Sequence, residues 1–189
     1  GGNTRARNRR HVRKEGMNTF FTEAGVLIVQ VVFGLYILAV LLRFLFQLSR
    51  ADFYNPISQF LVALTNPLLI PLRRIIPGLM GIDLASLVLL LALQLLELYV
   101  LSWLRDIPAA MLPLVLAAVV SLVRLVINVY FYAILIRVIL SWFMPYGMRQ
   151  NPAGDLLVSL TEPLMRPARR LLPAVGGLDL SPIVVLVGL

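Results

Sequence analysis

The chain has 189 residues, of which 60% are hydrophobic and only 14% are charged, with 17 Lys and Arg against 9 Asp and Glu. This composition excludes a disordered segment, a fibrous repeat and an ordinary soluble enzyme, and it is typical of a membrane protein with several spans. There is no cysteine and only one histidine, which excludes disulfides, thiolate sites and bis-histidine haem ligation. We therefore expect no metal site and no cofactor.

The first 16 residues differ from the remainder of the chain. Residues 1–16 are polar and hold six of the 17 basic residues. One interpretation is a basic arm that binds nucleic acid or anionic lipid. The interpretation that we favour is a non-native leader before a start at Met17, and we expect no nucleic-acid partner.

Three apolar stretches are long enough to cross a membrane, which takes about 20 residues. They are Gly25–Gln47, Leu84–Leu104 and, inside a longer run, Val119–Trp142, which follows a helical or interfacial lead-in from Ala109. A further run, Leu180–Leu189, has ten residues and is too short to span. We expect it to begin a fourth span, so the predicted fold is all-helical, with about four transmembrane helices of which the last is truncated.

An internal repeat relates the two halves of the chain. At an offset of 96, residues 55–84 match residues 151–180 at 15 of 30 positions, and upstream an offset of 94 pairs Arg43 with Arg137. Each unit consists of a span, a Pro-rich connector and a span, and we place the units at residues 17–108 and 109–189. An even number of spans per unit makes this a parallel repeat, unlike the inverted repeats of many transporters.

The repeated positions are mostly polar residues, prolines and arginines. Nine of the 15 are Asn55, Pro56, Thr65, Pro67, Pro71, Arg73, Arg74, Pro77 and Asp83 in the first copy, and Asn151, Pro152, Thr161, Pro163, Pro167, Arg169, Arg170, Pro173 and Asp179 in the second. The pattern T-x-P-L-x-x-P-x-R-R-x-x-P, followed six residues later by D-L, resembles the YggT (YlmG) family of small bacterial and plastid membrane proteins. The resemblance implies an integral protein of the bacterial inner membrane. It also implies a loose link to osmotic or potassium homeostasis, to division-site organisation and, in plastids, to cytochrome maturation.

The connectors contain recognisable helix signals. Asn55-Pro56 and Asn151-Pro152 fit an N-cap and the first residue of a helix. Asn66-Pro67 and Thr161-Glu162-Pro163 repeat that chemistry further on, and Pro71 and Pro167 should bend or end a helix. We therefore expect two short helices with a bend in each connector. Apolar residues at three- and four-residue spacing predict that the first connector is amphipathic and interfacial.

The paired arginines of the connectors are expected at the headgroup level of the membrane. As candidate binding residues for anionic lipid or a partner we name Arg73, Arg74, Arg169 and Arg170. The alternative, which we favour, is that these side chains simply snorkel towards water. Asp83 and Asp179 are expected to pair with these arginines. The alternative is that Asp83 and Ser181-Pro182 cap the spans that follow.

Glu97 is the one acid deep inside a predicted span. A hairpin that turns near residues 106–110 would bring Glu97 to the depth of Arg124. An ionisable residue inside a membrane suggests a functional role, for example in ion movement. We favour the alternative, in which Glu97 and Arg124 form a structural ion pair between two helices.

The distribution of arginines predicts the orientation of the chain in the membrane. The connectors hold seven arginines, whereas the central hairpin holds Arg105 beside Asp106, which predicts cytoplasmic connectors.

No HExxH, P-loop, GxSxG or Gly-rich dinucleotide motif is present, so we expect no enzyme activity. We favour a non-catalytic membrane scaffold or assembly factor whose connectors engage lipid or protein partners. The alternative is a small channel or transporter component in potassium or osmotic homeostasis, and either could form homo-oligomers.

Overall fold

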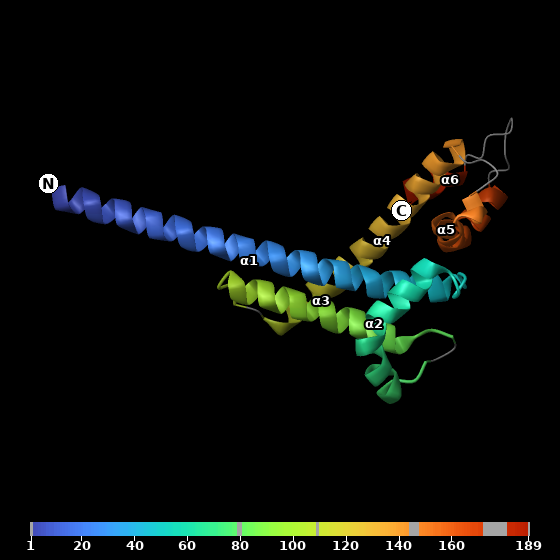
Figure 1. Cartoon of the computed structure of the whole chain (residues 1–189), viewed down its shortest axis with the longest axis horizontal. Helices are drawn as coiled ribbons and strands as arrows, with labels where there is room; N and C mark the ends of the chain where they lie inside the picture. The colour runs from blue at the N-terminus through green and yellow to red at the C-terminus, as the bar shows by residue number, and fades with distance from the viewer. Residues whose placement is uncertain (1, 79–80, 109, 144–147, 172–180, 189) are drawn as a thin grey trace.

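The computed structural model describes residues 2–78, 81–108, 110–143, 148–171 and 181–188. Within these ranges the chain is helical and has no β-sheet, as the sequence predicts (Figure 1). The elements in chain order are α1 (Gly2–Leu48), α2 (Pro56–Ile75), α3 (Leu84–Leu104), α4 (Met111–Phe143), the short 3-10 helix η1 (Met148–Gln150), α5 (Pro152–Leu171) and α6 (Ser181–Gly188).

Three helices of the described chain are long and apolar enough to cross a membrane: Thr19–Leu48 of α1, α3 and α4. The second predicted span coincides with α3 at both ends. The lead-in predicted before the third span belongs to the same helix, because α4 runs without interruption for 33 residues. The helix α6 begins where the fourth span is predicted to begin.

The core is one cluster that draws on five helices. Its buried members are Ile37, Val40, Leu41 and Leu45 from α1, Leu69 from α2, Ala85, Leu89 and Leu90 from α3, Ala133 from α4 and Leu160 from α5. Most of them come from α1 and α3, which lie side by side (Figure 1). Since each connector also contributes a buried side chain, both connectors are packed onto the bundle.

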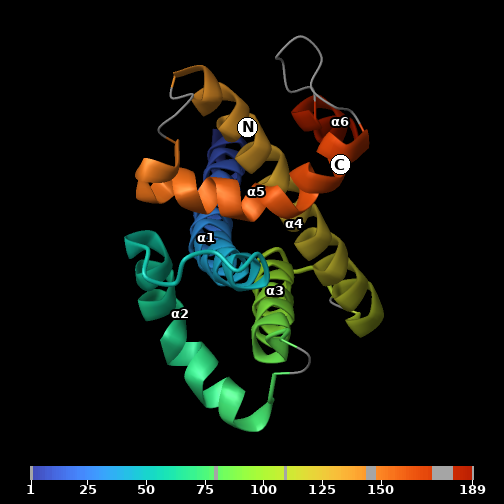
Figure 2. The same ribbon diagram turned by 90° about the vertical axis from the view of Figure 1, so that its right-hand side faces the viewer.

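The connectors α2 and α5 lie at the same end of the bundle, where α1 ends (Figures 1 and 2). Their first turns are joined by a hydrogen bond that Asn55 Nδ2 donates to the carbonyl oxygen of Pro152, at 2.8 Å. A parallel repeat requires this placement. Its two units enter the membrane from the same side, so their connectors must both lie on one and the same side of the membrane.

The predicted N-caps are confirmed in both copies. The side-chain oxygen of Asn55 accepts a hydrogen bond from the Ile57 N–H at 3.0 Å, and that of Asn151 accepts one from the Ala153 N–H at 3.1 Å. In each copy the next residue is a proline, which has no N–H to leave unpaired in the first turn.

The prediction that each connector divides into two short helices is wrong. The helix α2 continues through Pro67 and Pro71, and α5 continues through Pro163 and Pro167. Figure 2 shows α2 bending along its length without a break. The prolines therefore curve the connectors, and neither Asn66 nor Thr161 begins a new helix.

Side chains of α1 support α2 at the place where proline disturbs it. Arg43 Nη1 donates to the carbonyl oxygen of Val62 at 3.2 Å, and the hydroxyl of Tyr36 donates to that of Leu64 at 3.4 Å. Both carbonyls lie in the turn before Pro67, on either side of Ala63, whose carbonyl is the one that Pro67 leaves without a helical N–H donor. The neighbouring span thus provides hydrogen bonds that the sequence of the connector alone does not reveal.

Candidate functional site

A buried arginine of the first span holds the first connector. Arg43 is only 8% exposed, and its Nη1 donates to Thr65 Oγ1 at 2.6 Å and to Asn66 Oδ1 at 2.9 Å. The Thr65 hydroxyl in turn donates to the carbonyl oxygen of Leu61 at 2.7 Å. A buried guanidinium requires hydrogen-bond partners, and α2 supplies them on the face that it turns towards α1.

The second copy repeats this arrangement with one change of charge. Arg137 Nη1 donates to Thr161 Oγ1, also at 2.6 Å, and the Thr161 hydroxyl donates to the carbonyl oxygen of Leu157 at 2.8 Å. Where the first copy has Asn66, the second has Glu162, and its carboxylate lies 3.3 Å from Arg137. Arg137 therefore contacts an acid, whereas the side chains that bond to Arg43 are uncharged.

Sequence analysis paired Arg43 with Arg137 and Thr65 with Thr161, but it gave these residues no joint role. The arginine lies on a span and the threonine on the next helix, 22 residues later in the first copy. The one available signal was that both members recur in both copies. We call each pair, Arg43 with Thr65 and Arg137 with Thr161, an arginine–threonine clamp.

Asp83 fills both of the roles predicted for it as alternatives. Its carboxylate forms an ion pair with Arg73, and it caps α3 by accepting hydrogen bonds from the N–H and the hydroxyl of Ser86. Burial acts to raise the pKa of Asp83, but the hydrogen bonds from Arg73 and Ser86 and the charge of Arg73 outweigh it. The pKa of this carboxyl therefore lies below its ordinary value. The equivalent Asp179 and Pro173 lie outside the described residues.

The other connector arginines differ between the copies. Arg169 and Arg166 both reach the carboxylate of Glu162, at 3.4 and 3.5 Å. Arg74 and Arg170 are exposed, as is Pro77 just beyond the end of α2. Of the four arginines named as candidates for binding lipid, two take part in ion pairs. Arg73 pairs with Asp83 at the start of α3, and Arg169 pairs with Glu162 on α5.

Glu97 and Arg124 are not brought together. Glu97 Oε2 accepts a hydrogen bond from Gln94 Nε2 at 2.7 Å, within α3, while Arg124 is exposed on α4. In the described part of the chain no ion pair joins these two side chains. Glu97 therefore finds its polar partner one turn away on its own helix.

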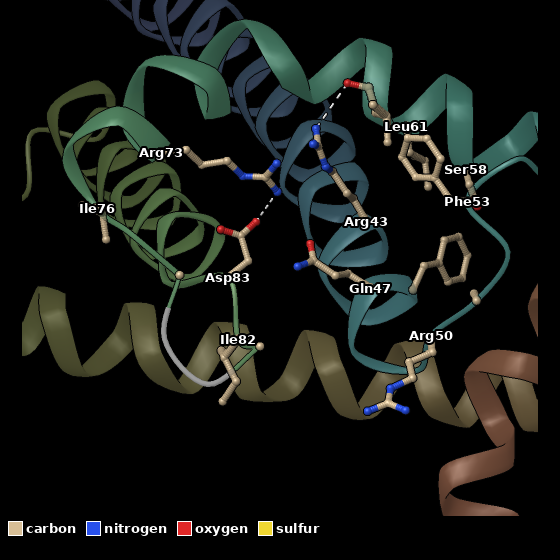
Figure 3. A pocket seen from close by; sticks show the side chains of 15 residues that line it. Arg43, Gln47, Arg50, Phe53, Ser58, Leu61, Arg73, Ile76, Ile82 and Asp83 are labelled. Atoms are coloured by element: carbon tan, nitrogen blue, oxygen red, sulfur yellow. Dashed lines mark hydrogen bonds and ion pairs between the residues drawn. The ribbon is translucent and has the colours of Figure 1, made fainter.

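A cavity of about 670 Å³ lies beside the first clamp, between the end of α1, the connector α2 and the segment that leads into α3 (Figure 3). Its charged lining residues are Arg43, Arg50, Arg73 and Asp83. Apolar walls are supplied by Phe46, Phe53, Leu61, Ile76 and Ile82. Sequence analysis did not predict this cavity, because its residues come from three elements whose crossing is visible only in the structure.

Arg50 is placed at the cavity by the way in which α1 ends. It has a φ of +52°, and the N–H of Ala51 donates to the carbonyl oxygen of Phe46 at 2.9 Å while that of Arg50 donates to Gln47 at 3.2 Å. These two bonds form a Schellman turn, which commonly closes a helix. The turn reverses the chain and gives the end of α1 a cationic side chain.

No group of three or more His, Cys, Asp or Glu residues that could hold a metal ion occurs in the part of the chain that the structure describes. Apart from the Asp83 carboxylate, which is paired with Arg73, the polar side chains that line the cavity carry guanidinium, hydroxyl and amide groups. Such groups donate hydrogen bonds to anionic oxygens, and an arginine can do so through two parallel bonds.

Comparison with known proteins agrees with this architecture. The family model CCB3/YggT matches residues 22–104 and 116–189, two segments that correspond to the two repeat units. An uncharacterized protein of Pseudomonas aeruginosa is 47% identical over 170 residues, covering 89% of this chain and 83% of that protein. The uncharacterized protein YggT of Escherichia coli K12 is 37% identical over 163 residues, covering 84% of this chain and 81% of that protein.

No solved structure matches the chain significantly. The family match covers both repeats, each with a long apolar helix followed by a clamped, proline-containing connector. The chain therefore belongs to the CCB3/YggT family and is a membrane protein with several candidate spanning helices.

Proposed function

We propose that this protein is a non-catalytic scaffold or assembly factor of the bacterial inner membrane, which engages lipid or protein partners through its connectors. The observation that carries the proposal is the outward face of α2. Six large apolar residues of α2 are exposed, and five of them follow one row at helical spacing: Ile57, Phe60, Leu64, Leu68 and Ile75. Exposed apolar rows of this kind are typical of interaction surfaces at membranes or between proteins.

The outward face of α2 is displayed on a rigid support. On the adjacent side of the helix, about a quarter turn away, Leu61, Thr65 and Leu69 are buried, and Thr65 is bonded to Arg43. Because the clamp fixes the rotation of α2 about its own axis, the apolar row cannot turn inwards. A scaffold needs a surface of this kind, whose presentation does not depend on the partner.

The two connectors differ in what they present. On α5 the large apolar side chains point inwards, with Leu156, Leu160 and Met165 all buried. Exposed positions of α5 include Arg166, Arg169 and Arg170. We infer that α2 contacts an apolar or interfacial partner, whereas α5 faces water and headgroups.

The arginine distribution supports cytoplasmic connectors. The end of the bundle that carries α2 and α5 holds Arg73, Arg74, Arg169 and Arg170. Apart from residues 1–16, which we interpret as a non-native leader, the other end holds Arg105 next to Asp106 in the α3–α4 hairpin. Cytoplasmic loops are enriched in Lys and Arg, and the relatives from Pseudomonas aeruginosa and Escherichia coli are bacterial proteins. The inner membrane, with the connectors inside the cell, is the placement that agrees with both.

The test uses full-length protein in liposomes of phosphatidylethanolamine and phosphatidylglycerol. Since the chain has no cysteine, a fluorophore can be attached at Phe60→Cys on α2 or, as a control, at Arg166→Cys on α5. We expect lipids with a nitroxide near the headgroup to quench the fluorophore at position 60 more strongly than the one at position 166. Potassium flux should equal that of empty liposomes.

Two results would contradict the proposal. Equal quenching at the two positions would show that the apolar row of α2 does not meet the membrane interface. Potassium flux well above that of empty liposomes, abolished by a substitution in a span, would favour the channel alternative.

A further inference from the structure

The cavity beside the first clamp carries more positive than negative charge. Three arginines line it against one aspartate, so its net formal charge is +2. Arg73 is paired with Asp83, whereas the hydrogen-bond partners of Arg43 are a hydroxyl, an amide and a carbonyl. Among the described residues Arg50 takes part in no ion pair. Arg43 and Arg50 therefore attract an anion into the cavity.

A buried hydroxyl in the same cavity has no partner. Ser58 is 6% exposed, and its Oγ makes no hydrogen bond in the described structure. Burying a hydroxyl without a hydrogen bond is unfavourable, and most buried polar atoms have a partner. Ser58 and the side chain of Gln47 both line the cavity, so they add neutral donors to the cationic ones (Figure 3).

The walls and the depth of the cavity identify the kind of anion. Arg43 lies five residues before the end of α1, which is about 7.5 Å along the helix axis, so the cavity lies near the boundary of the hydrocarbon layer. Phe46, Phe53 and Ile82 add apolar surface next to the arginines. An anionic group that carries hydrocarbon can contact both the arginines and the apolar walls, whereas a free inorganic anion can contact only the arginines.

The second copy does not reproduce these features. Arg137 forms an ion pair with Glu162, which replaces Asn66. The position of Arg50 corresponds to Met144 or Tyr146, depending on the offset used, and that of Ser58 corresponds to Gly154. The clamp is shared by both copies, but in the first the clamp arginine bonds to uncharged groups, whereas in the second it contacts the carboxylate of Glu162.

We propose that this cavity binds the phosphate headgroup of an anionic phospholipid, with Arg43, Arg50 and Arg73 facing the phosphate and the apolar walls facing the upper acyl chains. The inference deepens the proposed function, on which it rests, by naming a partner for the end of the bundle that carries α2. It assigns the binding to the cavity and not to the exposed Arg74 or to Arg170.

The experiment measures binding of short-chain phosphatidylglycerol to the full-length protein in a zwitterionic detergent, by thermal shift and by titration calorimetry. Short-chain phosphatidylcholine and inorganic phosphate are the two comparison ligands. We expect saturable binding of phosphatidylglycerol, at least tenfold weaker binding of phosphatidylcholine, and no binding of inorganic phosphate in the same concentration range.

Variants locate the site. Arg43→Gln is a poor probe because it also removes the clamp, so the test uses Arg50→Gln and Arg73→Gln. Each should weaken phosphatidylglycerol binding about tenfold, since each removes a charged hydrogen-bond donor. Arg74→Gln is the matched control, because it removes the same charge from the residue next to Arg73 but outside the cavity lining. It should change the affinity less than twofold.

Three outcomes would overturn the inference. Equal losses for Arg73→Gln and Arg74→Gln would indicate attraction by surface charge alone. Binding of inorganic phosphate as tight as that of phosphatidylglycerol would show that the ligand is a free anion. Absence of any saturable binding, in protein that retains stronger quenching at position 60 than at position 166, would remove the lipid site and leave the proposed scaffold function standing.

Discussion

At the scale of single residues, the hydroxyl of Thr65 connects a span to its connector. It accepts from Arg43 and donates to Leu61, and Thr65 is fully buried. Thr65→Val keeps the shape of the side chain but leaves the Arg43 donor without this acceptor. We predict a loss of about 1–3 kcal/mol in the free energy of unfolding, measured by denaturation in detergent micelles.

Two comparisons make the Thr65 prediction specific. Thr65→Ser retains the hydroxyl and should cost clearly less than Thr65→Val. Thr161→Val should also cost less, since Arg137 keeps the carboxylate of Glu162. If Thr65→Val were as stable as the parent protein, the clamp would contribute nothing to the fold.

A second residue-scale prediction concerns the acid sensitivity of Asp83. The pKa of Asp83 lies below its ordinary value in the folded protein, because hydrogen bonds and the charge of Arg73 outweigh its burial. Its contribution to stability is therefore complete above the pKa of an unfolded aspartate, about 4, and is lost as the pH falls through the lower folded value.

Thermal unfolding between pH 7 and pH 2.5 measures this contribution, with Asp83→Asn as the comparison. The parent protein should be more stable than Asp83→Asn at neutral pH, and the difference should shrink only in the acid range below pH 4. A constant difference across the whole range would show that the charge of Asp83 is not what stabilises the foot of α3.

At the scale of elements, the sequence predicts that the connectors are amphipathic. It does not predict which of their apolar residues pack against the bundle and which are exposed. The spacing of apolar residues in α2 indicated one apolar face. The structure divides that face, with Leu61 buried against the bundle while Phe60 and Leu64 are exposed. The buried side of α2 also contains Ser58 and Thr65, which a sequence pattern assigns to water. Only knowledge of Arg43 on a neighbouring helix explains why a hydroxyl belongs inside.

The effect of the prolines on α2 also could not be predicted from the sequence. Pro67 and Pro71 predicted a break, since proline removes backbone hydrogen bonds and clashes with the preceding turn. Tertiary contacts from Tyr36 and Arg43 supply hydrogen bonds to that turn, and α2 bends without ending. A local signal was thus overruled by contacts between residues that are distant in sequence.

A prediction at the scale of elements concerns Glu97 on α3 and Arg124 on α4. Glu97 is bonded to Gln94 within α3, and Arg124 is exposed on α4. We predict that the stability losses of Glu97→Leu and Arg124→Leu add in the double variant to within about 0.5 kcal/mol. Recovery of most of the loss in the double variant would instead demonstrate a direct ion pair between the helices.

At the scale of the whole molecule, the repeat carried most of the information in the sequence. The apolar stretches predicted the all-helical fold. The repeat predicted the order span, connector, span and the placement of both connectors at one end, where Asn55 bonds to Pro152. It could not predict the charged cavity, because that cavity arises where the copies differ. Asn66 against Glu162, and Arg50 without a counterpart, are single substitutions whose effect depends on the crossing of three elements.

The central claim is that both connectors lie on the cytoplasmic side of one membrane, held there by the spans. Single cysteines at Gln59 on α2 and Ser159 on α5 test it, because Gln59 is exposed, unlike the neighbouring Ser58, and the chain has no other cysteine. A third cysteine at Ala110, in the hairpin between α3 and α4, reports the opposite side.

The measurement is labelling of intact cells by a maleimide that enters the periplasm but does not cross the inner membrane, compared with labelling after lysis. The account predicts that positions 59 and 159 react only after lysis, while position 110 reacts in intact cells. Labelling of positions 59 and 159 in intact cells would reverse the orientation, and labelling of only one of them would contradict the parallel repeat itself.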